Sequence, residues 1–106
     1  MSFQLGSALL DACVLSILNQ GDTYGYVLTQ QVKEVMNISE STLYPVLRRL
    51  QKNEFLITYD EPFQGRNRRY YQITPLGKLK YQEYILDWKS YKSKVDHILL
   101  GGMKDE

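Results

Sequence analysis

The sequence predicts a mainly α-helical protein with a small β-hairpin, arranged as a winged helix-turn-helix plus a long C-terminal helix. Three observations lead to this prediction. Apolar residues recur at helical spacing in three segments before residue 54. The pattern then changes to strand-like alternation over residues 55–74, and helical spacing returns over residues 75–99. A hairpin that directly follows two closely spaced helices is the wing of such a fold.

Length and composition set the outer limits. The 106 residues suit one compact domain, and 43% hydrophobic with 24% charged residues is typical of a globular chain. The single cysteine, Cys13, excludes an internal disulfide and a cysteine-rich zinc site. The first residues lack the features of a signal peptide, and no apolar run approaches the roughly 20 residues that span a bilayer. We therefore expect a cytoplasmic protein without a membrane partner.

The first two helices are predicted from their apolar spacing. Residues 8–19 form the first, with Leu10 and Val14 on its apolar side, and Gly21-Asp22 ends it. The second covers about residues 24–36.

The third helix is predicted over residues 40–53, with a narrow apolar stripe that includes Leu43, Leu47 and Leu50. Pro45 is unusual here, because proline fits only the first turn of a helix. Either the regular helix starts near Ser41 or Thr42, or it bends at Pro45. The side away from the stripe and its margins carry Ser41, Thr42, Tyr44, Arg48, Arg49 and Lys52.

The hairpin is predicted as two strands, residues 55–59 and 69–74, around a segment rich in turn-forming residues. Its tip is basic. All five arginines of the chain fall between residues 48 and 69, although the net charge is only +1. Arginine presents a planar fork that suits phosphate oxygens and guanine edges, so the cluster indicates a localised anionic partner.

The last helix is predicted over residues 75–99, because Thr74 is a good N-cap and Pro75 a good first residue. Gly101-Gly102 stops it, and residues 101–106 are expected to be a flexible tail. Its apolar stripe is more than a short monomer covers, which favours a homodimer. The interface is predicted to contain Leu10, Val14, Tyr84, Trp88, Tyr91, Val95, Ile98 and Leu99.

These elements together predict double-stranded DNA as the partner. The third helix has the size to enter the major groove, and the wing would reach a neighbouring stretch of backbone. Arg69 has the alternative of pairing with a carboxylate across the hairpin, and Tyr71 is predicted to lie in the core. The predicted DNA contacts are Ser41, Thr42, Tyr44, Arg48, Arg49, Lys52, Gly65, Arg66, Asn67 and Arg68.

Three segments, "YGYVLTQQV", "STLYPVLRRLQKNEFL" and "GRNRRYYQITPLG", resemble the PadR-like transcriptional regulators over most of residues 10–77. The resemblance implies a winged helix-turn-helix over residues 1–74 and one dimerisation helix over residues 75–100, as in the short branch of that family. It also implies a homodimeric repressor that releases its operator when an effector binds. By the match, Thr42, Tyr44 and Arg48 belong to the recognition helix, and Gly65, Arg66 and Arg68 to the wing.

One departure from the family pattern concerns the end of the third helix. Glu54 stands where the family usually has a glycine, which permits the left-handed turn that ends a helix. Asn53 is the residue expected to take that conformation instead.

Trp88, the only tryptophan, has two possible roles. It is either an anchor of the dimer interface or a ligand platform, on which the two tryptophans of a dimer sandwich a planar aromatic effector. The neighbours of such a ligand would be Tyr84, Tyr91 and Asp87.

Other classes of function are less well supported. His97 is the only histidine, and no phosphate loop, dinucleotide motif or metal-ligand spacing is present, so we predict neither an enzyme nor a cofactor. The main alternative is a winged-helix module that binds protein rather than DNA. RNA is a weaker alternative, because the aromatic residues form no exposed stacking row.

Overall fold

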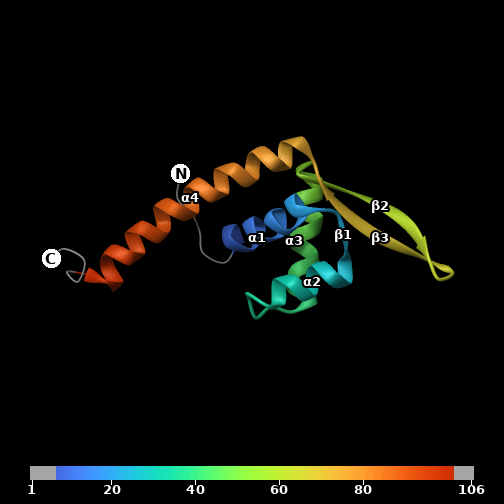
Figure 1. Cartoon of the computed structure of the whole chain (residues 1–106), viewed down its shortest axis with the longest axis horizontal. Coiled ribbons are helices and arrows are strands. Elements are labelled where there is room, and N and C mark those ends of the chain that lie inside the picture. Colours follow the sequence, from blue (N-terminus) through green and yellow to red (C-terminus); the bar gives the residue numbers. More distant parts are fainter. Residues whose placement is uncertain (1–6, 102–106) are drawn as a thin grey trace.

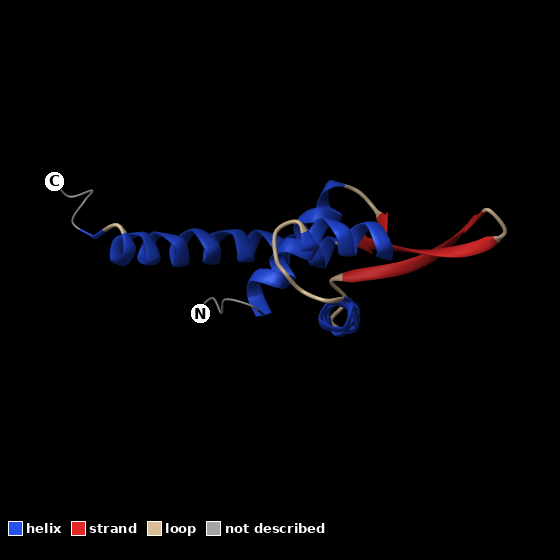
Figure 2. Ribbon diagram, turned by 90° about the horizontal axis from the view of Figure 1, so that it is seen from below, coloured by secondary structure: helices blue, strands red, loops and turns tan. Residues whose placement is uncertain are grey.

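The computed structural model describes residues 7–101, and its elements follow the predicted order (Figure 1). The elements are α1 (Ser7–Gln20), β1 (Thr23–Tyr24), α2 (Gly25–Lys33), α3 (Glu40–Lys52), β2 (Leu56–Phe63), β3 (Arg66–Ile73) and α4 (Pro75–Leu99). The molecule is elongated, with principal extents of 62 × 26 × 21 Å. The first three helices cluster at the centre, and the β2–β3 hairpin and α4 project from them in opposite directions (Figures 1 and 2).

The core lies where the apolar sides of the first three helices meet the base of the sheet. The predicted stripe of α3 is confirmed, since Leu43, Leu47 and Leu50 are buried. Burying each leucine contributes about 2 kcal/mol relative to leaving it exposed. The other core residues are Leu10, Val14, Leu15, Leu18, Leu28, Val32, Leu56 and Ile73.

The placement of Leu10 and Val14 corrects the predicted dimer interface. Both side chains are buried in the protein's own core, so neither offers surface to a second copy. The sequence shows that the stripe of α1 is apolar but does not show which partner covers it.

The sheet has three strands, one more than the predicted hairpin. Thr23 and Tyr24 form β1, which pairs antiparallel with Tyr71 and Tyr70 of β3 and gives the order β1-β3-β2. Two residues are too few to show an alternating pattern, so this strand is not detectable from the sequence.

The hairpin is longer and its turn shorter than predicted. β2 and β3 have eight residues each, and only Gln64 and Gly65 separate them. Both have positive φ, 52° and 80°, as the central residues of a type I′ turn require. Pro62 pairs with Asn67, and a proline is tolerated there because β2 is an edge strand. The predicted loop over residues 60–68 was therefore wrong, since the ladder extends through its turn-forming residues.

Two helices have boundaries that the apolar pattern did not settle. α2 ends at Lys33, and Val35, which had extended the predicted helix, is 75% exposed. α3 starts at Glu40, where the Ser39 side chain accepts a hydrogen bond from the backbone N–H of Thr42. The helix then continues across Pro45, which lies on the exposed side.

The end of α3 corrects the expectation for Asn53. Its φ is −83°, and Glu54 takes the left-handed conformation instead, with φ of 67°. The backbone N–H groups of Glu54 and Phe55 donate to the carbonyls of Gln51 and Leu50, each over 2.9 Å. This is the Schellman pattern that usually places a glycine at the position of Glu54.

Thr74 connects this turn to the start of α4. Its hydroxyl donates to the carbonyl of Glu54 over 2.6 Å and accepts from the N–H of Gly77 over 2.9 Å. The N–H of Thr74 also donates to the carbonyl of Phe55, over 3.1 Å. The predicted N-cap is confirmed, and it fixes α4 against the end of α3.

α4 ends at Leu99, followed by Gly101 with a positive φ of 47°. Apart from Gly101, the predicted flexible tail lies outside the described residues. Within residues 7–101, none of the helices combines the length and the apolar character required to cross a bilayer.

Replacing Gly77 with alanine is expected to destabilise the protein by at least about 2 kcal/mol. A Cβ at this position would overlap the carbonyl oxygen of Phe55 and approach Cγ1 of Ile73 to 2.8 Å. Gly25→Ala is the matched control, because its Cβ would meet Tyr71 and Tyr44 at the ordinary distances of 3.7 and 3.8 Å. Urea denaturation of both variants measures the difference, and equal free energies of unfolding would contradict the close approach at Gly77.

Candidate nucleic-acid interface

The side of α3 opposite its buried leucines is polar, basic and exposed. Ser41, Thr42, Arg48 and Lys52 are all exposed on it. Their positions follow from the helix period, because the leucines that face the core leave these residues on the other side. The hydroxyls of Ser41 and Thr42 lie 2.8 and 3.3 Å from that of the N-cap Ser39, so the helix begins with a group of three hydroxyls.

Tyr44 lies at the margin of this side, where α3 meets the wing. It is half-buried and packs against the core together with Tyr71, whose predicted core position is confirmed. Burial raises the pKa of Tyr71, and the positive charges of Arg69 and Arg48 oppose that rise. A Cβ at Gly25 would lie 3.7 Å from Tyr71 of β3 and 3.8 Å from the hydroxyl of Tyr44 of α3, so α3 meets the base of the wing at these two tyrosines.

Arg49 has an intramolecular partner, Asp11 of α1. Its two terminal nitrogens donate to the two carboxylate oxygens over 2.9 and 2.6 Å, and this hydrogen bonding raises the pKa of Arg49. The Asp11 side chain is 3% exposed, whereas that of Arg49 is 43% exposed. We therefore do not include Arg49 in the proposed interface, because DNA would have to compete with the buried Asp11 carboxylate for the guanidinium group of Arg49.

The wing tip carries Gly65, Arg66 and Asn67, all exposed. Arg66 follows the two-residue turn directly and pairs in register with Phe63. Arg48, Lys52 and Arg66 make no ion pair within residues 7–101, so their charges are available to an anionic partner.

Arg68 is clamped between two aromatic rings. Its guanidinium carbon lies 3.9 Å from the ring centre of Tyr24 and 3.6 Å from that of Phe63. Such cation–π contacts stabilise the charged group while covering its two faces. The two contacts hold the guanidinium of Arg68 between β1 and β2.

Arg69 pairs with a carboxylate across the hairpin, the alternative to DNA contact that the sequence left open. Its Nε donates to Asp60 on the opposite strand over 3.3 Å, at the register position that pairs the two residues. This pair neutralises one of the positive charges of the wing.

The base of the wing is fixed by contacts that the sequence did not reveal. Asp22, between α1 and β1, accepts hydrogen bonds from the Tyr59 hydroxyl over 2.7 Å and from Nε2 of Gln72 over 3.0 Å. The bond to Asp22 raises the pKa of Tyr59 to about 12. The Tyr59 ring stacks on Tyr70 with centres 5.5 Å apart. The wing is thereby attached to the loop after α1.

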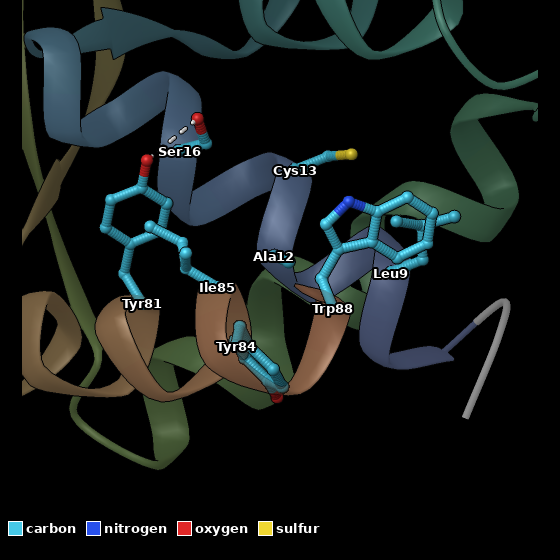
Figure 3. Close-up of a pocket in the computed structure, with 8 residues that line it drawn as sticks. All are labelled: Leu9, Ala12, Cys13, Ser16, Tyr81, Tyr84, Ile85 and Trp88. Atoms are coloured by element: carbon cyan, nitrogen blue, oxygen red, sulfur yellow. Dashed lines mark hydrogen bonds between the residues drawn. The ribbon is translucent and has the colours of Figure 1, made fainter. Parts of the chain in front are cut away.

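A cavity of about 320 Å³ lies between α1 and α4 (Figure 3). Of the predicted ligand residues, Trp88 and Tyr84 line it, whereas Tyr91 and Asp87 do not. The ring of Tyr91 lies 6.2 Å from that of Trp88. The sequence missed the contribution of α1, because only the tertiary structure brings α1 against α4. The complete lining consists of Leu9, Ala12, Cys13, Ser16, Tyr81, Tyr84, Ile85 and Trp88.

The far half of α4 extends beyond the helical cluster (Figure 1). Its apolar residues are poorly covered: Ile98 is 77% and Leu99 73% exposed, and Val95 is half-buried. Trp88 and Tyr91, also in the predicted interface, are half-buried.

Within residues 7–101, no group of three or more His, Cys, Asp or Glu side chains is placed to hold a metal ion. Burial raises the pKa of Cys13, so its thiol stays protonated and is a poor nucleophile.

Comparisons with known proteins agree on one family. Residues 14–83 match the model of the transcriptional regulator PadR-like family. The chain is 35% identical over 97 residues to uncharacterized protein X of Lysinibacillus sphaericus, covering 87% of this chain and 89% of that protein.

Solved structures show the same similarity. The protein smu.1704 of Streptococcus mutans superposes with a TM-score of 0.85 at 37% identity, covering 95% of both chains. A PadR-like transcriptional regulator of Bacillus cereus superposes with a TM-score of 0.79 at 30% identity, covering 88% of this chain and 93% of that one.

Two adjacent arginines of α3 are expected to differ sharply in their effect on stability. Arg49→Ala leaves the Asp11 carboxylate buried without its charged partner and should cost about 2 kcal/mol, less than for a fully buried pair because Arg49 is half-exposed. Arg48→Ala, on the exposed side, should change stability by less than about 0.5 kcal/mol. Thermal and urea denaturation compare the two variants. An equal loss of stability in both would contradict the pairing of Arg49 with the buried Asp11.

Proposed function

Because the chain belongs to the PadR-like family of DNA-binding transcriptional regulators, we propose that it is a homodimeric repressor with a specific operator, released by a small-molecule effector. The observation that carries this proposal is the exposed basic side of α3 beside the wing, with Arg48, Lys52 and Arg66 unpaired within residues 7–101. The family consists of regulators of transcription, not of enzymes.

In the proposed complex, α3 enters the major groove and the wing follows the adjacent phosphate backbone. Arg48 projects from the middle of the exposed side, where a guanidinium reaches guanine edges or phosphate. The hydroxyls of Ser41 and Thr42 contact the DNA at the start of the helix. Arg66 contributes charge at the wing tip, and Arg68 donates to phosphate from the edge of its clamped guanidinium.

The proposed dimer uses α4. The helix has 25 residues, and Val95, Ile98 and Leu99 of its far half extend an apolar surface past the core. A second copy would cover this surface and set the distance between the two recognition helices. Half-sites about 34 Å apart, one turn of the duplex, would then be read from one face. In this proposal the region up to residue 74 binds DNA and residues 75–100 form the dimer.

The proposed effector is a planar aromatic molecule that binds at Trp88. The support is an apolar cavity large enough for a small aromatic compound, with Trp88 and Tyr84 in its lining. The cavity lies between α1 and α4, so an occupant acts on the helix that we assign to the dimer. A change in the angle between subunits alters the half-site spacing and releases the operator.

DNA binding is tested with a duplex that the wild-type chain selects from a random pool. Arg66→Ala should weaken binding to all duplexes alike and reduce the salt dependence of log K by about one unit, because one phosphate contact is lost. Arg48→Ala should cost about 1–3 kcal/mol on the selected duplex and relax its sequence preference. Fluorescence anisotropy over a salt series measures both effects.

Lys89→Ala is the matched control, since it removes one exposed positive charge from α4, away from α3 and the wing. If Arg48→Ala and Arg66→Ala bind like this control at every salt concentration, the docking model is wrong. If the wild type selects no duplex, a protein-binding winged helix becomes the better assignment.

The dimer is tested with Val95→Glu, which should shift the protein from dimer to monomer because a carboxylate would lie unpaired in an apolar interface. Ser93→Glu is the control: Ser93 lies about 200° around the helix from Val95 and is exposed. Sedimentation velocity measures the mass of each variant. A monomeric wild type would contradict the proposal directly.

The effector is tested through the emission of Trp88, the only tryptophan of the chain. Proflavine, a planar aromatic cation, should quench this emission saturably, whereas spermidine, a cation without rings, should leave it unchanged. An unchanged Trp88 signal up to millimolar proflavine would exclude the stacking site.

A further inference from the structure

A single carboxylate, that of Asp11, joins three helices. The residue is only 2% exposed, and it accepts two hydrogen bonds from Arg49 of α3. It also accepts one from the Tyr84 hydroxyl of α4, over 3.0 Å. The partners lie 38 and 73 residues away along the chain, so the contact depends on the tertiary arrangement.

The geometry of the carboxylate makes its two partners dependent on each other. Oδ2 accepts both from Arg49 and from Tyr84, at 2.9 and 3.0 Å. A buried carboxylate needs its hydrogen bonds, because an unpaired charge in the interior is strongly unfavourable. If Tyr84 moves with α4, the Asp11 carboxylate must either reorient or lose the hydrogen bond from the Tyr84 hydroxyl. Either change alters its hydrogen bonds with Arg49.

Both ends of this network lie at surfaces to which the proposed function assigns a role. Tyr84 lines the cavity between α1 and α4, one helical turn before Trp88, and its hydroxyl points away from the cavity (Figure 3). Arg49 directly follows Arg48, the residue that we assign to the major groove. The path from the cavity to the DNA-facing helix therefore consists of three side chains.

We propose that Asp11 is a positioning residue that couples the placement of α4, through Tyr84, to the placement of the recognition helix α3, through Arg49. The functional consequence rests on the proposed function, in which α3 binds DNA. Coupling between two sites is reciprocal in free energy. An occupant that displaces Tyr84 changes how α3 meets the duplex, and DNA bound to α3 changes the surroundings of α4.

Amide hydrogen exchange of the free protein tests the coupling without DNA. Tyr84→Phe removes the hydroxyl and keeps the ring, so the protein should still fold. The α3 amides should exchange at least about fivefold faster than in the wild type, the low end of common coupling energies, while the α2 amides keep their rates. A purely structural role would accelerate α2 and α3 together and would overturn the proposal.

Tyr81→Phe is the matched control for this measurement. Tyr81 lies on the same helix and lines the same cavity, but its hydroxyl faces Ser16, at 3.5 Å, and not Asp11 (Figure 3). The α3 amides of the Tyr81→Phe variant should exchange as fast as those of the wild type. Equal α3 exchange in Tyr84→Phe and Tyr81→Phe would overturn the proposal.

Trp88 emission then tests the reverse direction. Saturation of the wild type and of Tyr81→Phe with the selected duplex should change this emission, whereas Tyr84→Phe, saturated with the same duplex, should show no change. An unchanged wild-type signal, or a wild-type response in Tyr84→Phe, would overturn the coupling. If no duplex is selected, the proposed function fails, and the exchange measurement still decides whether Asp11 couples the two helices.

Discussion

The arrangement of the whole molecule depends on the close approach between the start of α4 and the end of α3. Gly77 leaves no room for a side chain beside the carbonyl of Phe55, and Thr74 bonds to the backbone on both sides of that contact. The same few residues end α3, receive the returning strand of the wing and start α4. One contact region thus determines how α3, the wing and α4 are oriented, and it explains why a strained Glu54 is tolerated at the turn.

The five arginines show how one residue type is used in different ways. Arg48 and Arg66 are exposed and unpaired within residues 7–101, which suits contact with phosphate or bases. Arg68 is fixed between aromatic rings, and Arg69 is neutralised by Asp60. Arg49 is taken up by the buried Asp11. The positive charge available to DNA is therefore smaller than the number of arginines between residues 48 and 69 suggests.

The cavity and the buried carboxylate give α4 a second importance beyond the proposed dimer. Tyr84 contacts both, so its position reflects the state of the cavity and the state of the network around Asp11. In the proposed repressor, regulation therefore needs no separate ligand domain. The Asp11 carboxylate bonds α4, which lines the cavity, to α3, the helix that we propose to face the duplex.

The sequence by itself determined the four helices, the hairpin and their order, because periodicity, the Thr74 cap and the glycine near Leu99 act within a few residues along the chain. It also located the exposed basic side of α3. Only the tertiary structure decided that Leu10 and Val14 face the core, that β1 joins the sheet, and that Arg49 binds Asp11. Each of these depends on residues far apart in the chain, and local patterns carry no information about which distant surface a side chain will meet.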